Sequence, residues 1–462
     1  TGKTDYVNGG TNAPLAKLAG WGPRATETGL GVGIPGFWAG FEASLAKHGS
    51  KTKKDLCAAA IAYARDGFEV HPFLWGEIFE QANLFGKSAE AREIFFPNDR
   101  MVHPGELLFQ KRAADTLERL VSEGNRFFYE GDFVRDYCAT VKADGGVAMP
   151  EDFARYDVRY DEPARGTYRG YDIVSMPPPS SGGILLIQML NILEAYQLKP
   201  GDPASLHLLI EAMKLAYADR AQFLGDPAVT IAPVAGLMSK RYAEERRALI
   251  NPDKATPPNE IKPGNPLPHE GSNTTHYSVV DRFGNVVSNT YTLNDSYGNG
   301  LVAEGTGVLL NNELDDFAAA HGAPNAFGLV GFDANAPGPN KRPLSSMTPT
   351  IVLKNGKPFL VTGSPGGSRI ITVVLQVLLN AIDHGMPIAA AVQTPRIHHQ
   401  WLPDEVMVEA GIAPAAVTAL EARGHRVTVR PPLSSANSIM VTPDGFVGAA
   451  DTRTRGALAA GY

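Results

Sequence analysis

Thr274 begins the segment Thr-Thr-His-Tyr-Ser-Val-Val-Asp, which reads as a strand that follows a Pro-rich stretch. A Thr hydroxyl is too weakly acidic to attack an amide unaided, and one remedy is a backbone amine on the same residue that acts as its general base. That amine exists only if the bond between Asn273 and Thr274 is cut. We therefore predict that the chain cleaves itself at this bond and that Thr274 becomes the catalytic nucleophile. The structural alternative is a Thr-rich hairpin edge, because Thr is a good strand former.

The glycine pair Gly366-Gly367 is the second feature that could do chemistry. Two successive Gly amides in a tight loop can point their N–H groups at one spot, and fixed donors aimed at a developing oxyanion are a large catalytic term. Without side chains, the pair also lets a substrate approach closely. The alternatives are an ordinary turn between a strand over 359–362 and a helix that starts near Ile370, or a phosphate loop. The Lys-Ser/Thr ending of a P-loop is missing, which disfavours the phosphate loop.

Polar residues downstream of Thr274 have side chains that could contact charged groups of a ligand. Asn294, Glu313 and Asp316 offer carbonyl and carboxylate acceptors, which suit an ammonium group. Ser345 and Ser346 offer hydroxyl donors, which suit a carboxylate. A solvated turn around Asp316 and a helix cap at the two Ser residues are the structural alternatives.

Several separate motifs resemble those of the γ-glutamyltranspeptidase (glutathione hydrolase) family of N-terminal nucleophile hydrolases. The resemblance extends from Thr274 to the carboxyl terminus and includes three upstream segments, while the first thirty or so residues fit poorly. The downstream motifs are Thr290-Tyr291-Thr292-Leu293-Asn294, Leu310-Asn311-Asn312-Glu313-Leu314-Asp315-Asp316-Phe317, Arg342-Pro343-Leu344-Ser345-Ser346-Met347 and Gly363-Ser364-Pro365-Gly366-Gly367-Ser368-Arg369. The upstream motifs are Gly33-Ile34-Pro35-Gly36, Ala64-Arg65-Asp66-Gly67-Phe68 and Pro177-Pro178-Pro179-Ser180-Ser181-Gly182-Gly183.

The resemblance implies an α+β fold of the four-layer αββα sandwich type. It implies one interlocked domain, cut into a large segment 1–273 and a small segment 274–462 that remain together as a heterodimer. The implied substrates are small γ-glutamyl or related amides, with water or an amine or peptide as acceptor and without a cofactor or metal. Thr292 would steady the nucleophile by a hydrogen bond. The resemblance also points to a periplasmic or secreted protein with a further segment upstream of Thr1.

Two departures from the family pattern concern the substrate. Gly10 stands where the family has an Arg that clamps the glutamyl α-carboxylate, and Arg24 is a possible substitute. Loss of a charge-assisted contact of this kind should cost about 1.5–3 kcal/mol of affinity. Phe327 stands where several bacterial relatives have a Tyr that bonds across the pocket to Asn294, so we expect a more open pocket.

Other functions remain open at this point. An acylase of the cephalosporin-acylase type, with a different acyl donor such as a glutaryl group, is the first alternative. A binding protein that keeps the fold but never matures is the second. The cluster His398, His399 and Asp404 could suggest a metal, but adjacent His residues point in different directions and no further ligand completes a tetrahedral set. A Ser-His-Asp hydrolase lacks a convincing Gly-x-Ser-x-Gly elbow.

Hydrophobic periodicity and turn residues predict the elements that must position these candidates. Helical spacing occurs over 40–66, 106–124, 204–224 and 367–384. Strand pairs are predicted at 276–292, 349–362 and 437–450, with turns at 281–285, Asn355-Gly356 and Asp444-Gly445. The stretch 251–270 contains six prolines and reads as irregular chain before the predicted cleavage site.

Composition is that of a globular enzyme, with 44% hydrophobic and 20% charged residues among 462. The net charge of −7 and the lack of a long basic run argue against a nucleic-acid partner. No run of about eighteen consecutive apolar residues predicts a membrane span. Two cysteines, Cys57 and Cys138, could form at most one disulfide.

Overall fold

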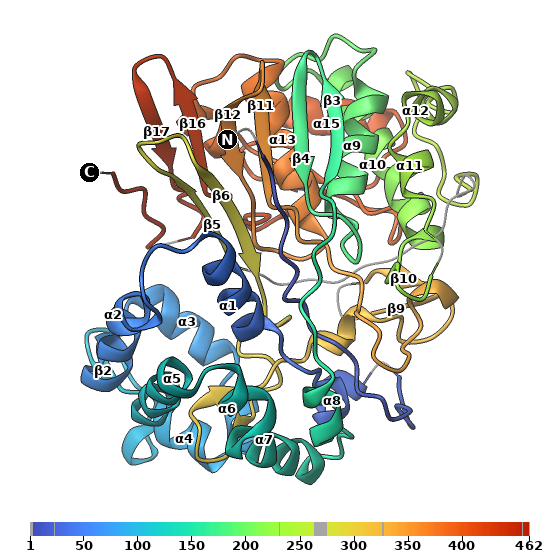
Figure 1. The fold of residues 1–462 in the computed structure, drawn as a ribbon. Helices are drawn as coiled ribbons and strands as arrows, with labels where there is room; N and C mark the ends of the chain where they lie inside the picture. The colour runs from blue at the N-terminus through green and yellow to red at the C-terminus, as the bar shows by residue number, and fades with distance from the viewer. Residues whose placement is uncertain are drawn as a thin grey trace.

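The computed structural model describes residues 3–22, 24–230, 232–262, 275–325, 328–454 and 456–461. These residues mix helices and sheets, which agrees with the predicted α+β class (Figure 1). The predicted cleavage site, Asn273 and Thr274, lies outside the described residues, and so does Phe327.

The largest sheet has six strands in the order β17-β16-β12-β11-β4-β3, and every neighbouring pair in it is antiparallel. Two strands come from before the predicted cleavage site and four from after it. The predicted hairpins at 349–362 and 437–450 are confirmed, and Asn355 and Gly356 supply the positive φ angles that a tight hairpin turn requires. The strands are β3 (Ala164–Tyr168), β4 (Tyr171–Ser175), β11 (Thr350–Lys354), β12 (Lys357–Thr362), β16 (Ser438–Thr442) and β17 (Gly445–Ala449).

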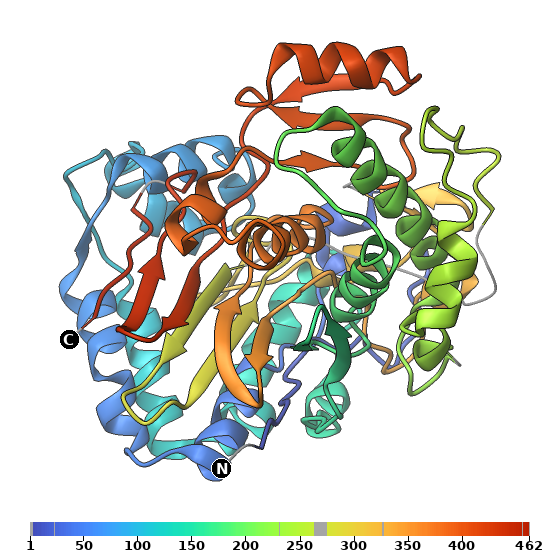
Figure 2. The ribbon, with the colours of Figure 1, turned by 90° about the horizontal axis from the view of Figure 1, so that it is seen from above.

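The hairpin that follows the predicted nucleophile Thr274 in the chain packs against this sheet (Figure 2). It consists of β5 (Thr275–Val280) and β6 (Val286–Tyr291), as the strand prediction for 276–292 requires. Ser288 Oγ donates to the carbonyl of Thr362 at 3.0 Å, and Asn437 Nδ2 donates to the carbonyl of His276 at 3.1 Å. These bonds fix the hairpin next to the end of β12. Thr292 directly follows β6 rather than lying within it.

Helices α9 (Gly182–Leu193) and α13 (Arg369–Ile382) are almost wholly apolar and buried, and they form the main core with β3, β4, β11 and β12. A Cβ at Gly166 on β3 would lie 2.5 Å from the Ile187 side chain, so the absence of a side chain there lets α9 approach the sheet. Helix α10 (Pro203–Phe223) packs on α9. Both α10 and α13 match their predicted ranges.

Residues 37–154 form a mostly helical part below the sheets in Figure 1. The single helical range predicted over 40–66 is divided, because Gly49 ends the first helix and the Thr52 side chain caps the second in a capping box with Asp55. The range predicted over 106–124 begins late, because Leu107–Leu108 pairs as a strand. The elements are α1 (Phe37–His48), α2 (Lys53–Asp66), β1 (Phe68–Glu69), α3 (Pro72–Glu80), α4 (Ala89–Phe95), β2 (Leu107–Leu108), α5 (Lys111–Glu123), α6 (Asn125–Glu130), α7 (Asp132–Ala143) and α8 (Pro150–Ala154).

The remaining elements border these layers. A three-stranded sheet in the order β13-β14-β15 carries α15 on one side. Among the described residues, no helix is both long and apolar enough to span a membrane. The bounds are α11 (Val234–Leu237), α12 (Lys240–Arg247), β7 (Val302–Ala303), β8 (Val308–Leu309), β9 (Ala323–Pro324), β10 (Val330–Gly331), α14 (Ile388–Gln393), β13 (Ile397–His398), β14 (Val406–Glu409), α15 (Pro414–Ala422) and β15 (Val427–Arg430).

Candidate active site

The glycine pair forms a sharp loop between β12 and α13. Gly366 has φ +115° and Gly367 has φ +65°, conformations that residues with side chains rarely adopt. A Cβ at Gly366 would lie 2.3 Å from Ser434 Oγ, so only glycine fits against that residue. Within the described parts of the chain, neither glycine N–H donates to a protein acceptor. An oxyanion site requires donors that the protein itself does not use, and both glycines meet that condition.

Ser368, which follows the glycine pair, is held by side chains that the sequence analysis did not select. The Tyr217 hydroxyl, on α10, donates to the carbonyl of Ser368. Ser368 Oγ donates to Gln400 Oε1 at 2.9 Å, and the same oxygen lies 3.0 Å from His398 Nε2. All four side chains are buried or nearly so. The loop is thus held in place by hydrogen bonds to α10 and to the segment that follows β13.

Ser434 is positioned by a buried ion pair. Arg396 and Asp451 are 1% and 0% exposed, and their charged atoms are 2.7 Å apart. Arg396 Nη1 donates to the carbonyl of Ser434 at 2.6 Å, while Asp451 Oδ2 accepts from the N–H of Ala436 at 2.9 Å. The pair therefore ties the segment beside Gly366 to the end of the sheet.

Asp451→Ala is expected to lower the free energy of unfolding by about 3–5 kcal/mol, because Arg396 would remain buried without its counter-charge. Urea denaturation followed by circular dichroism measures the change. Asp115→Ala is the control, since Asp115 is 63% exposed in its pair with Arg65, and it should cost less than about 1 kcal/mol. Equal losses for the two variants would contradict the assigned role of the buried pair.

His276, on β5, is the histidine nearest in sequence to Thr274, and both of its ring nitrogens form hydrogen bonds within the protein. Ser278 Oγ donates to the carbonyl of Asn437, so it accepts from His276 Nε2 at 3.0 Å. His276 Nδ1 then accepts from Thr290 Oγ at 2.8 Å. Burial lowers the pKa of His276 to about 3. A neutral imidazole with so low a pKa is a poor general base at neutral pH.

Thr292 and Asn294 occupy the turn that leaves β6. Thr292 Oγ1 accepts from the N–H of Asn294 at 2.8 Å, and Asn294 adopts φ 74°, which Asn tolerates better than most residues. Asn294 is 1% exposed, and its Nδ2 donates to the carbonyl of Asn312 at 3.3 Å. Asn294 therefore lies beside the segment that contains Glu313.

That segment is the short 3-10 helix η5 (Glu313–Asp316), which is buried throughout. Asn311, just before it, exchanges two hydrogen bonds of 3.0 Å with the backbone of Gly33 and so anchors it to the upstream chain. Burial and the nearby carboxylates of Asp295 and Asp315 raise the pKa of Glu313 to about 8. Glu313 Oε2 has no hydrogen-bond partner among the described residues. These features fit a carboxyl group whose ionised form a bound cation would stabilise.

The two predicted serines are buried, and both hydroxyl oxygens accept a hydrogen bond. Ser345 Oγ accepts from the N–H of Met347 at 3.0 Å, and Ser346 Oγ accepts from Arg220 Nη2 at 3.1 Å. The pair does not cap a helix. Instead, Ser345 forms a bridge with Ser180 of the upstream Pro-Pro-Pro-Ser-Ser-Gly-Gly motif.

Arg220 is a further residue of the site that the sequence analysis missed. It lies on α10 and is 1% exposed, and its charge interacts with the carboxylate of Asp316. Arg220 thereby connects Asp316 to Ser346. The available signal was an Arg within an otherwise largely apolar part of the predicted helix 204–224.

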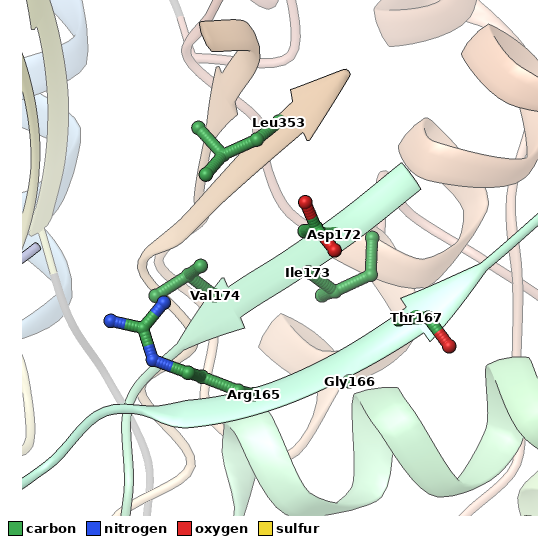
Figure 3. A pocket seen from close by; sticks show the side chains of 7 residues that line it. All are labelled: Arg165, Gly166, Thr167, Asp172, Ile173, Val174 and Leu353. Atoms are coloured by element: carbon green, nitrogen blue, oxygen red, sulfur yellow. The ribbon is translucent and has the colours of Figure 1, made fainter. Parts of the chain in front are cut away.

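Gly10 and Arg24 differ in their surroundings. Gly10 donates its N–H to Asn8 Oδ1 at 3.0 Å and accepts from the Tyr156 hydroxyl at 2.7 Å. Arg24 is exposed and lines a cavity of about 500 Å³ together with Gly20, Gly22, Ala25, Thr28 and Leu30. The short helices over 25–27 and 29–31 pack against η5. A second cavity, of about 230 Å³, lies on β3, β4 and β11 (Figure 3). None of the candidate residues lines that second cavity.

The histidines considered as metal ligands have separate hydrogen-bond partners. His398 Nδ1 lies 2.9 Å from Thr372 Oγ1, and His399 Nε2 lies 3.2 Å from Asp404 Oδ1. Trp401 donates its backbone N–H to His399 Nδ1 at 3.0 Å. These contacts fit a structural role for the two residues.

His207, Glu211 and His425 form another buried group with metal-ligand chemistry. His207 Nδ1 and His425 Nε2 are 2.7 Å apart and share a hydrogen bond. Two nitrogens on one tetrahedral zinc would be about 3.4 Å apart, given Zn–N bonds near 2.0–2.1 Å. Glu211 is already paired with Lys214 at 2.9 Å. We interpret this group as a hydrogen-bonded core network.

Comparison with known proteins gives consistent results. The family described as Gamma-glutamyltranspeptidase matches residues 18–461. The glutathione hydrolase proenzyme of Escherichia coli (strain K12) is 46% identical over 444 residues, which cover 95% of this chain and 77% of that protein. The acylase ACY 1 proenzyme of Pseudomonas sp. (strain SE83) is 37% identical over 92% of this chain and 74% of that protein. The crystal structure of cephalosporin acylase from Bacillus halodurans superposes with a TM-score of 0.87 at 27% identity, covering 98% and 84% of the two chains.

Proposed function

Because the chain belongs to the γ-glutamyltranspeptidase family, we propose that it is a self-cleaving enzyme that hydrolyses or transfers γ-glutamyl groups from small amides such as glutathione. The observation that carries the proposal is the packing of β5 and β6 against β12, the strand that leads into Gly366 and Gly367. This packing brings the strand that follows position 274 to the loop with two available N–H donors.

Cleavage between Asn273 and Thr274 would produce the segments 1–273 and 274–462 as two chains of one interlocked domain. The six-stranded sheet supports this, because β3 and β4 precede the cleavage site and the other four strands follow it. Neither segment could keep that sheet alone. The hairpin β5–β6 on one face and the helices α9 and α13 on the other are compatible with a four-layer αββα sandwich.

Thr274 is the proposed nucleophile, and its own amine is the proposed general base. The engaged state and low pKa of His276 support an amine rather than an imidazole in this role. The β5–β6 register pairs Thr275 with Tyr291, the last residue of β6, so Thr292 is the residue that the same register, continued by one position, would place opposite Thr274. Thr292 Oγ1 accepts from the N–H of Asn294, which leaves its proton to stabilise the nucleophile's oxygen.

In the proposed reaction, the Thr274 oxygen bonds to the carbonyl carbon of the γ-glutamyl amide and its proton passes to the amine. The N–H groups of Gly366 and Gly367 stabilise the oxyanion. The C–N bond then breaks, and the leaving amine takes the proton. Water, or an acceptor amine, attacks the acyl-enzyme in the same way and regenerates Thr274.

The α-amine and the α-carboxylate of the donor are assigned to two different groups of side chains, hydrogen-bond acceptors for the first and donors for the second. Asn294, Glu313 and Asp316 would accept from the ammonium. Ser345 and Ser346 would donate to the carboxylate, and no described residue accepts either hydroxyl proton. With Gly10 in place of an Arg, we expect weaker donor binding than a bidentate clamp gives. Arg24, which is exposed in its own cavity, is the remaining candidate for that contact.

An acylase with a glutaryl donor is the second candidate, which the acylase relatives favour. A glutaryl group has no ammonium to bind at Glu313 and Asp316, and we rank this candidate lower. A non-maturing binding protein ranks third.

The test begins with a denaturing gel of the purified protein and the amino-terminal sequence of any smaller fragment. A fragment that starts at Thr274 supports maturation, and one uncut chain would contradict it. Turnover of a γ-glutamyl anilide is then compared with that of a glutaryl anilide. We expect kcat/KM to be at least about 10-fold higher for the γ-glutamyl donor, the value of one charge-assisted contact. The reverse preference would establish the acylase instead.

The KM for a γ-glutamyl anilide is expected to fall by about 10-fold or more between pH 6 and pH 8.5, because Glu313, whose pKa is raised to about 8, gains its charge in this range. The same burial makes folding stability fall as pH rises from the ordinary Glu value to about 8, since only the unfolded chain has then released the proton.

Steady-state kinetics of the wild type and of Glu313→Gln at matched pH values check this. The variant retains the titration of the substrate amine, so only the difference between the two profiles reports Glu313. A parallel pair of profiles would refute the assignment.

A further inference from the structure

Arg220 contacts the proposed carboxylate site through hydroxyls rather than directly. Its Nε donates to Ser181 Oγ at 3.0 Å and its Nη2 donates to Ser346 Oγ at 3.1 Å. Ser181 Oγ in turn donates to the carbonyl of Ser345 at 3.1 Å. The Ser181 proton is therefore used inside the protein, whereas the Ser346 proton has no acceptor among the described residues.

The chemistry of guanidinium makes this arrangement directional. Arg has only donors, so the oxygen of Ser346 must accept from it, and the Ser346 hydroxyl is left to act as a donor. A hydroxyl that accepts from a cation is polarised, and hydrogen bonds that involve charged groups are stronger than neutral ones. Ser345 receives its bond from the backbone N–H of Met347 instead. Only one of the two serines thus depends on a side-chain cation.

Helix α10, which carries Arg220, also contacts the loop of the glycine pair. Tyr217 precedes Arg220 by three residues, so the two lie on one face of α10, and the guanidinium lies 5.8 Å from the Tyr217 ring centroid. Tyr217 bonds the carbonyl of Ser368 behind the glycine pair. The charge of Arg220 also interacts with Asp316. Arg220 is therefore held between the groups proposed to bind the two charges of the donor.

Resting on the proposed function, we infer that Arg220 is a positioning and specificity residue for donors that carry an α-carboxylate. Its guanidinium forces the Ser346 hydroxyl to donate towards the carboxylate, and it supplies a buried positive charge beside this hydroxyl in a chain that has Gly at position 10. The donor class selected is an amide whose acyl group has a carboxylate beside the ammonium.

The test compares two anilide donors in the matured enzyme. One is the γ-glutamyl anilide, and the other is the 4-aminobutanoyl anilide, which lacks only the α-carboxylate. Arg220→Gln should raise KM for the γ-glutamyl donor by about 10- to 100-fold, the range for loss of a charge-assisted contact, with a much smaller change in kcat. For the 4-aminobutanoyl donor, kcat/KM should change less than about 3-fold. An equal loss on both donors, or no loss on either, overturns the inference.

Ser181→Ala is the matched control, because it removes the other hydroxyl partner of Arg220 without removing Ser346. It should affect both donors equally and weakly, and a selective loss on the γ-glutamyl donor as large as that of Arg220→Gln would overturn the inference. Wild-type turnover of the γ-glutamyl donor tests the proposed function separately, since it involves no change at Arg220.

If Arg220→Gln does not mature, Arg220→Lys replaces it, because Lys keeps the charge but cannot reach both hydroxyls through a rigid fork. In the wild-type background, this change should raise KM for the γ-glutamyl donor about 5-fold; in the Ser346→Ala background, it should raise KM less than about 2-fold, because the hydroxyl that it acts through is gone. Additive effects in the two backgrounds would overturn the inference.

Discussion

Thr274→Ala is expected to yield one uncut chain that turns over no γ-glutamyl anilide, with a loss in kcat of at least about a thousandfold. The reason is that one hydroxyl is proposed to perform both the cleavage after Asn273 and the attack on substrate. A denaturing gel measures the first effect and anilide release measures the second. Thr274→Ser should still mature and retain measurable turnover, because it keeps a hydroxyl and an amine on the same residue.

Thr275→Ala is the matched control for this variant. Thr275 is the exposed first residue of β5 and lies next to the proposed nucleophile in the chain. It should mature and retain kcat within about 3-fold, which is a barrier change below 1 kcal/mol. Cleavage of the Thr274→Ala chain at the same bond, or full activity of an uncut chain, would eliminate Thr274 as the nucleophile.

Gly366→Ala is expected to lower kcat by about 100- to 1,000-fold, the cost of losing an oxyanion donor, with a smaller change in KM. The φ angle of +115° strains any residue with a Cβ, and the new methyl carbon would lie 2.3 Å from Ser434 Oγ and 2.6 Å from Ser434 Cβ. The loop must therefore shift, and the two N–H groups move with it. Steady-state kinetics on the matured enzyme measure the change.

Gly356→Ala separates strain from catalysis. Gly356 lies in the β11–β12 turn with φ +72°, and a Cβ there would meet no atom within 4 Å. It should lose about 1 kcal/mol or more of stability, as Gly366→Ala does from strain alone, yet keep its kcat. Ser434→Gly combined with Gly366→Ala should recover part of the lost kcat, because it removes the clashing atoms. Unchanged kcat in Gly366→Ala would dismiss the glycine pair as the oxyanion site.

Local sequence patterns predicted the helices and strands well where a segment shows a single hydrophobic period or a single type of turn. The hairpins at 276–292, 349–362 and 437–450 are formed as expected, because alternating strand residues flank Gly-containing turns. Helices α10 and α13 were found from their apolar spacing and length. The division of 40–66 into α1 and α2 was missed, although Thr52 and Asp55 form a local capping signal.

Arg220, Tyr217 and Ser434 were missed for a different reason. Each acts on a residue more than sixty positions away: Arg220 on Ser346, Tyr217 on Ser368 and Ser434 on Gly366. Nothing in the local spacing of a helix reveals which distant hydroxyl or carbonyl its side chains will reach. The raised pKa of Glu313 has the same origin, because it depends on burial and on Asp295.

The sequence by itself determined the residue types that can do the chemistry, the strands and turns that carry them, and the resemblance that joins them into one hypothesis. These are properties of short segments, which backbone geometry and side-chain periodicity govern locally. Only the tertiary structure decided that β5 and β6 pack on the strand leading to the glycine pair, and that α10 contacts both the glycine loop and Ser346. Such contacts join segments that are distant in the chain. They form because the apolar faces of the sheet and helices are buried against each other, and the few polar groups enclosed between them must then form hydrogen bonds with one another.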